Sequence, residues 1–279
     1  RIRNYYKAEK NSEEVFIISN NMGFNRELFV LQALRFYGYP ENRISIRRFD
    51  FNINHIIISQ LAEFKGKIDK VLIAHEIDTV VETLEKKINA QVKVIKRIAG
   101  DYVYAKVLEL PDKSLLLIFE IEYTNGEHIR SVLKALTDSV ERGGLGIREV
   151  AVYAAAGAVG NDIQFNDLLL YSDVYKYGEK LGLRLNNSVD TGKLREFIAQ
   201  GTKIHTVDFF TMPTVISTSV EDIEQISKDA TQGAIELELA HIVEELALKT
   251  GMTAKILYEV HDKPASRLKL DKEMSLGNS

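Results

Sequence analysis

The chain has 279 residues, of which 45% are hydrophobic and 27% are charged, an ordinary composition for a globular protein with a sizeable core. The formal net charge of −4 argues against a general nucleic-acid-binding protein, which needs a basic face to attract phosphates. The chain has no cysteine, so disulfides and thiolate chemistry are excluded. Because no apolar run approaches a membrane span and no signal peptide is visible, we expect a cytoplasmic protein without membrane partners.

The first 65 residues predict strands and helices but no candidate site. A β-prone run at 15–19 precedes a helical pattern at 26–37, and a second pair is expected over 44–64. We interpret residues 1–65 as an N-terminal extension or as a fragment of a neighbouring module. Residues 66–279 are then the main domain.

From residue 66 onward, short apolar strands alternate with helical patterns. The expected strands are 71–74, 102–109, 114–120, 149–155, 167–171, 203–209 and 255–260. The expected helices are 78–87, 127–142, 192–199, 220–228 and 235–249. Apolar strands separated by helices are typical of a sheet that is covered on both faces. The pattern therefore predicts an α/β protein, a three-layer α/β/α sandwich.

Ligands of such sheets bind beyond the carboxyl ends of the strands, so the residues that follow each strand matter most. Gly157 follows the strand at 149–155, and His261 and Asp262 follow the last strand. Glu236 and Glu238 stand near the expected start of the helix at 235–249. Each feature has an ordinary structural interpretation, as a tight turn, a cap or an acidic first turn of a helix.

Taken together, these segments resemble the nucleoside phosphorylase/nucleosidase superfamily over roughly 69–264. Residues 233–240 (Gly-Ala-Ile-Glu-Leu-Glu-Leu-Ala) are similar to its Gly-(Ala/Val)-x-Glu-Met-Glu-x-Ala segment, with Leu237 in place of Met. The end of the last strand is similar to its Ser-Asp, with His261 in place of Ser. Residues 206–211 resemble its aromatic segment, and residues 150–159 and 167–170 resemble its strand, glycine turn and following strand.

The resemblance implies a central mixed sheet and cleavage of the N-glycosidic bond of a purine nucleoside or nucleotide. It implies that Asp262 protonates the departing base, because the leaving purine gathers negative charge. The other implied site residues are Glu238 and Glu236 near the ribose hydroxyls, Leu237 beneath the ribose, Phe210 stacked on the base, and Gly157 as pocket backbone. It also implies a homo-oligomer, a dimer or a hexamer.

The parts that hold phosphate in the family are altered. Residues 152–157 (Val-Tyr-Ala-Ala-Ala-Gly) stand where the family has Arg-x-Gly-(Ser/Thr)-x-Gly, and alanines have no side-chain donors for phosphate. The first strand ends in Ala74-His75-Glu76 without the expected glycine, and only Gly126 remains of a second glycine loop. We therefore expect hydrolysis rather than phosphorolysis, with Glu76 as the candidate for positioning water.

Two other interpretations stay open. The loss of the phosphate loops favours a non-catalytic protein that binds a nucleoside-like ligand or serves as an assembly module. An unrelated Rossmann-like protein is disfavoured, because no Gly-x-Gly-x-x-Gly follows any strand. The six histidines lack recognisable ligand spacing, so no metal or other cofactor is expected.

Overall fold

The computed structural model describes residues 59–74, 76–99, 104–120, 126–212, 223–226, 232–249 and 251–264. The elements expected before residue 59 lie outside the described residues, and the boundary at residue 65 stays a prediction. Within this part of the chain, every helix is too short or too polar to span a membrane.

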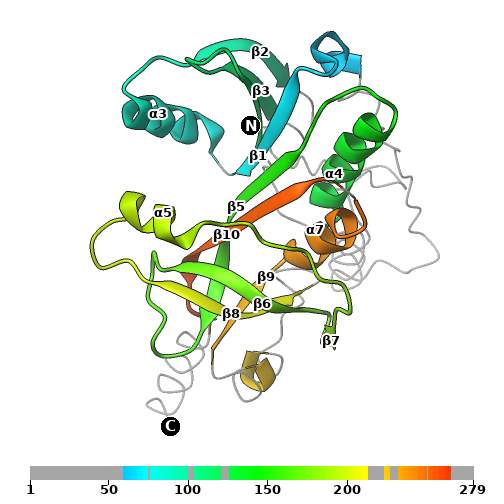
Figure 1. The fold of residues 1–279 in the computed structure, drawn as a ribbon. Coiled ribbons are helices and arrows are strands. Elements are labelled where there is room, and N and C mark those ends of the chain that lie inside the picture. The colour runs from blue at the N-terminus through cyan, green and yellow to red at the C-terminus, as the bar shows by residue number, and fades with distance from the viewer. Residues whose placement is uncertain are drawn as a thin grey trace, which may run out of the picture. The chain divides into compact units, whose positions relative to one another are not determined.

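In the described part of the chain, ten strands form one mixed sheet (Figure 1). They are β1 (Ile68–Ala74), β2 (Lys93–Ala99), β3 (Tyr104–Glu109), β4 (Leu115–Glu120), β5 (Glu149–Val159), β6 (Leu168–Lys176), β7 (Glu179–Lys180), β8 (Ile204–Thr211), β9 (Gly233–Glu236) and β10 (Thr253–Asp262). The helices are η2 (Ala62–Phe64), α3 (Ile77–Ile88), α4 (Gly126–Glu141), α5 (Thr191–Phe197) and α7 (Leu239–Leu246).

The long strand β5 divides the sheet. On one edge its first half pairs in parallel with β1, and its last residues pair antiparallel with β9. On the other edge it pairs in parallel with β10 along most of its length. Since β10 pairs with β6, β6 with β8 and β8 with β9, these strands and β5 close into a small barrel. The flat part of the sheet, β1 to β4, extends from the side of this barrel.

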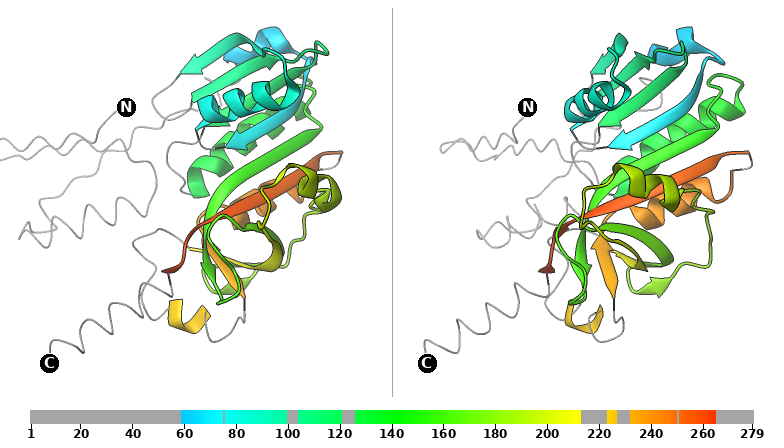
Figure 2. Two further views of the ribbon diagram at one scale, coloured as in Figure 1. Left: turned by 90° about the vertical axis from the view of Figure 1, so that its left-hand side faces the viewer. Right: turned by 60° about the vertical axis from the view of Figure 1, so that its left-hand side comes forward.

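Helices cover both faces of the sheet (Figures 1 and 2). On one face α3 and α5 lie together, where the Lys87 ammonium stands 5.7 Å from the centre of the Phe197 ring. On the other face α4 packs against α7, and Thr137 donates a hydrogen bond to Glu245 at 3.1 Å. This arrangement confirms the predicted three-layer α/β/α sandwich with a mixed sheet.

The predicted helix at 235–249 is wrong at its start. Residues 233–236 form β9, and α7 begins only at Leu239. Tertiary pairing decides this segment, because β9 satisfies its backbone groups against both β8 and β5. Strands β2 and β7 were not predicted, and the predicted helix at 220–228 lies largely outside the described residues. The other strands and helices α3, α4 and α5 lie close to their expected positions.

The apolar faces of α3 and the flat part of the sheet form one core cluster, in which Ile118 is fully buried. We expect Ile118→Ala to lower the free energy of unfolding by about 2–5 kcal/mol, because it leaves a cavity between helix and sheet. Ile88→Ala is the matched control, since this residue is 38% exposed and its loss should change stability by less than about 0.5 kcal/mol. Urea unfolding of both variants checks the prediction, and equal losses would contradict the proposed packing.

Candidate active site

The ends of four barrel strands bring several of the predicted site residues together. Gly157 near the end of β5 is in register with Asp262 at the end of β10 on one side and with Ile235 of β9 on the other. Ile235 is in turn in register with Phe210 of β8. The predicted residues therefore lie along one row that crosses β10, β5, β9 and β8, with Glu236 next to it at the end of β9.

Glu236 is buried, with 4% of its surface exposed, and both carboxylate oxygens have partners. Thr211 donates a hydrogen bond to Oε1. The backbone N–H groups of Glu238 and Leu239 donate to Oε2, and the hydroxyl of Tyr258 lies 3.3 Å from the same oxygen. Burial raises the pKa of Glu236, although these hydrogen bonds act in the opposite direction. The carboxylate thus connects β8, β9, β10 and the start of α7.

Leu237 and Glu238 are the next two residues of the chain after Glu236. Glu238 is the residue before α7, is 3% exposed and lies at the positive end of that helix, which favours a carboxylate. Leu237 packs with Phe210 against a cluster of Val159, Met212 and Ile226. The Phe210 ring also stacks on Tyr175, with 4.8 Å between ring centres. The predicted floor of the ribose site and the predicted wall of the base site are therefore neighbours.

Asp262 and Gly157 occupy the other end of the row. Asp262 is half-buried, and its carboxylate accepts a hydrogen bond from the backbone of Lys263 at 2.7 Å. A Cβ atom on residue 157 would stand 3.2 Å from Cδ of Pro264. Glycine at this position therefore allows the Pro264 ring to approach the backbone of β5 closely.

Glu76 is placed differently from the other candidates. It is exposed and has a left-handed backbone conformation, with φ of 51°, at the start of α3. The adjoining end of β1 is in register with Tyr153, which precedes Gly157 by four residues, or roughly 13 Å along β5. The row of site residues does not include Glu76, and its predicted role remains a prediction.

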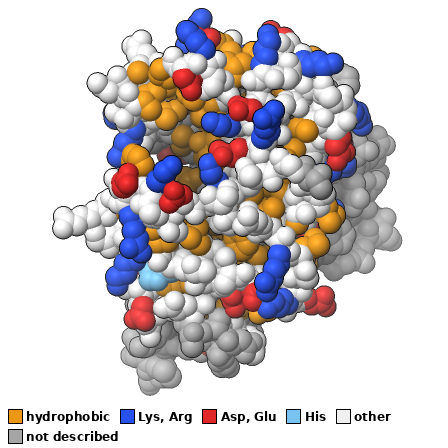
Figure 3. Space-filling model, in the orientation of Figure 1, with side chains coloured by type: hydrophobic (Ala, Val, Ile, Leu, Met, Phe, Trp, Pro, Cys, Tyr) orange, Lys and Arg blue, Asp and Glu red, His pale blue; other side chains and the backbone are white. Residues whose placement is uncertain are grey.

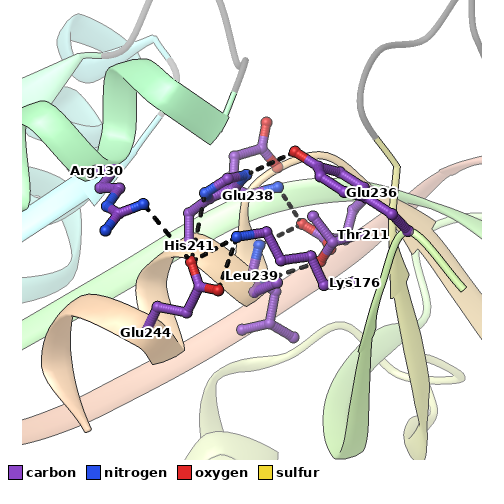
Figure 4. A network of polar contacts seen from close by, with 10 residues as sticks. Arg130, Lys176, Thr211, Glu236, Glu238, Leu239, His241 and Glu244 are labelled. Carbon is purple, nitrogen blue, oxygen red and sulfur yellow. Dashed lines mark hydrogen bonds and ion pairs between the residues drawn. The ribbon is translucent and has the colours of Figure 1, made fainter. Parts of the chain in front are cut away.

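The structure reveals a polar network that sequence reasoning did not identify (Figure 4). Lys176 at the end of β6 donates to both carboxylate oxygens of Glu244 at 2.7 Å, and Arg130 of α4 lies 3.9 Å from the same group. His241 of α7 points into this network, and its Nε2 lies 3.4 Å from the Tyr177 hydroxyl. One feature of the sequence could have indicated this network. Residues 238, 241 and 244 are spaced three apart, which places their side chains on one face of a helix.

His241 is a buried histidine without a good acceptor or donor at Nδ1. It is 6% exposed, and Nδ1 lies 3.8 Å from Glu244, beyond hydrogen-bond distance. The pKa of His241 is lowered from 6.5 to about 4, chiefly by burial and also by Lys176 and Arg130, while Glu244 acts in the opposite direction. The ring is therefore neutral at neutral pH.

A second polar group faces the altered phosphate region. Ala155 of β5 is in register with Glu259 of β10. The hydroxyl of Tyr153 donates a hydrogen bond to the Glu259 carboxylate, and His261 Nε2 lies 3.6 Å from it. A carboxylate thus stands beside the strand segment where the resemblance would place phosphate ligands. Among the described residues, no group of His, Asp or Glu is arranged to hold a metal ion.

The solved structures that share this fold include three that represent its phosphorylases and hydrolases. Uridine phosphorylase from Schistosoma mansoni in complex with thymidine is 12% identical, with a TM-score of 0.56 over 80% of this chain and 88% of that chain. A futalosine hydrolase mutant of Helicobacter pylori is 12% identical, with a TM-score of 0.52 over 76% of this chain and 99% of that one. The 5′-methylthioadenosine/S-adenosyl homocysteine nucleosidase of Helicobacter pylori is 15% identical, with a TM-score of 0.53 over 74% and 91%. No family model and no curated protein sequence matches the chain.

We expect Thr211→Val to lower the free energy of unfolding by about 1–3 kcal/mol, because it removes a donor to the buried Glu236 and the acceptor of the Ala240 N–H at 3.0 Å. Thr206→Val on the same strand is the control, since Thr206 is exposed and its replacement should have little effect. Urea unfolding measures both variants. A loss in the control as large as that at residue 211 would show that the strand, rather than the carboxylate, is sensitive.

The lowered pKa of His241 makes a prediction about acid stability. Below pH 6.5 the unfolded chain gains a proton that the folded protein excludes until about pH 4, so acidification over this range favours unfolding. We expect wild-type protein to lose up to about 3 kcal/mol of its free energy of unfolding over this pH range through His241, and we expect His241→Gln to abolish that loss. Urea unfolding between pH 7 and pH 4 gives the slope, and His261→Gln, at a side chain that is 60% exposed, should keep the wild-type slope. Parallel slopes in both variants and the wild type would rule out His241 as the cause.

Proposed function

From the fold of the nucleoside phosphorylases and nucleosidases, we propose that this chain cleaves the N-glycosidic bond of a purine nucleoside or nucleotide by hydrolysis. The observation that carries the proposal is the row of strand ends that sets Asp262, Gly157 and Phe210 in register beside Glu236 and Glu238. Asp262 at one end of this row can act on the base of a nucleoside, while Glu238 near the other end binds its ribose.

In the proposed reaction the two carboxylates have different roles. Asp262, when protonated, donates its proton to the purine as the glycosidic bond breaks and negative charge builds on the base. Glu238 accepts hydrogen bonds from ribose hydroxyls, and its charge favours the positive character that develops on the sugar. Phe210 stacks on the base and Leu237 contacts the ribose. Glu236 has a structural role and does not contact the ligand, because its carboxylate oxygens accept hydrogen bonds from groups of the protein.

Water is the preferred nucleophile because the phosphate region has the wrong charge. The alanines at 154–156 provide no side-chain donors, and Glu259 opposite Ala155 would repel a phosphate dianion. A carboxylate there can instead accept a proton from an attacking water. Glu259 therefore joins Glu76 as a candidate for positioning that water.

A non-catalytic ligand-binding or assembly protein is the second candidate. Two contacts favour it: the Pro264 ring covers the backbone of Gly157, and Phe210 is already stacked on Tyr175. Both contacts occupy groups that a nucleoside would need. As with the catalytic proposal, we infer a cytoplasmic homo-oligomer with a small-molecule nucleoside or nucleotide as its ligand.

The proposal predicts release of free base from a purine nucleoside or nucleotide in the absence of phosphate. Chromatography of a panel of purine and pyrimidine nucleosides and nucleotides, with and without phosphate, measures it. We expect Asp262→Asn to lower kcat by about 100-fold or more, the usual contribution of a general acid. Asp112→Asn, in an exposed turn between β3 and β4, is the matched control and should keep full activity.

The other outcomes separate the alternatives. Base release that requires phosphate would overturn hydrolysis, although it would keep Asp262 as the acid. Binding of a nucleoside without release of base would support the non-catalytic interpretation. Equal activity in Asp262→Asn and Asp112→Asn would remove Asp262 from the mechanism.

A further inference from the structure

A surface pocket of about 500 Å³ lies where α5 leads into β8. It is lined by Arg195 of α5 and by residues 198–205, which form the connecting loop and the start of β8. None of these nine residues is among the predicted site residues. Phe210 lies on the same strand five residues beyond His205, or roughly 16 Å along it. The pocket is therefore separate from the Phe210 end of the candidate active site.

The lining of this pocket is basic. Arg195, Lys203 and His205 contribute to it, and none of its nine residues is acidic. Within the described part of the chain, neither Arg195 nor Lys203 forms an ion pair. This is a local departure from a chain whose net charge is −4. Figure 3 shows Lys and Arg side chains, in blue, along the left-hand margin of the drawn face, with Asp and Glu side chains, in red, among them.

A buried carboxylate behind the pocket fixes the histidine. Asp167 is 3% exposed, and its Oδ2 lies 2.9 Å from His205 Nε2. Its two oxygens also accept hydrogen bonds from the backbone N–H groups of Gln164 and Lys203, at 2.8 and 2.9 Å. Burial alone would raise the pKa of Asp167, but these hydrogen bonds and His205 hold that pKa below its usual range. An ionised Asp167 thus orients the His205 ring.

We propose that this pocket binds a phosphate group, as inorganic phosphate or as part of a small phosphate ester. Arginine offers a planar pair of donors that matches phosphate oxygens, lysine adds charge and further donors, and a histidine ring nitrogen adds a polar contact. The hydroxyl of Thr202 and the amide of Gln200 add neutral donors to the same lining. The volume is within the range of pockets that hold small molecules, so there is room for the organic part of an ester.

Calorimetric titration of the full chain with inorganic phosphate and with ribose 5-phosphate tests the proposal. We expect Arg195→Gln and Lys203→Gln each to weaken binding by about 10-fold or more, because each removes a charge-assisted contact. Lys193→Gln, also on α5 but outside the pocket, is the matched control and should bind as the wild type does. Histidine NMR gives an independent readout, in which phosphate should shift the ring signals of His205, identified by their loss in His205→Gln.

The proposal does not rest on the proposed function, and Glu238→Gln separates the two. This variant should retain phosphate binding even if nucleoside cleavage is lost or was never present. Tighter binding of ribose 5-phosphate than of phosphate would identify an ester as the ligand, and equal binding would identify phosphate itself. Absence of binding, or the same loss in Lys193→Gln as in Arg195→Gln and Lys203→Gln, would overturn the proposal.

Discussion

The buried carboxylate of Glu236 holds together the part of the molecule on which the candidate site depends. It lies where β9 ends, and its partners come from β8, β10 and the first turn of α7. A carboxyl group at this depth is tolerated only because hydrogen bonds satisfy it. Its position fixes where α7 begins, and so where Glu238 stands in relation to the strand ends. Glu236 thereby stabilises the segment that carries Leu237 and Glu238.

Acidic and basic side chains lie in different regions of the described structure. Acidic residues gather around the start of α7, where Glu236 and Glu238 lie, and Glu259 of β10 lies beside β5. The basic groups lie elsewhere, with Lys176 and Arg130 engaged by Glu244 and with Arg195 and Lys203 lining a separate pocket. These basic groups therefore lie outside the strand segment where the resemblance would place phosphate.

Much of the fold could be predicted from the sequence, because its apolar strands and amphipathic helices have clear periods. Segment 233–240 shows where this reasoning fails: its composition suits a helix, but β9 forms since two neighbouring strands complete its hydrogen bonds. Only part of the candidate site could be predicted. Asp262 is indicated by its place at a strand end and Phe210 by the resemblance, whereas Lys176, Tyr177 and Glu259 meet their partners through contacts between elements distant in sequence.

Strand β5 belongs to the flat part of the sheet and to the barrel at once. Neither part can separate from the other without breaking the hydrogen bonds of this shared strand, so the two should unfold as one cooperative unit. Strand separation is then too costly to serve as a route for ligand entry. Any motion that admits a ligand must come from connecting segments and side chains, while the strand ends that carry Gly157 and Asp262 keep their spacing.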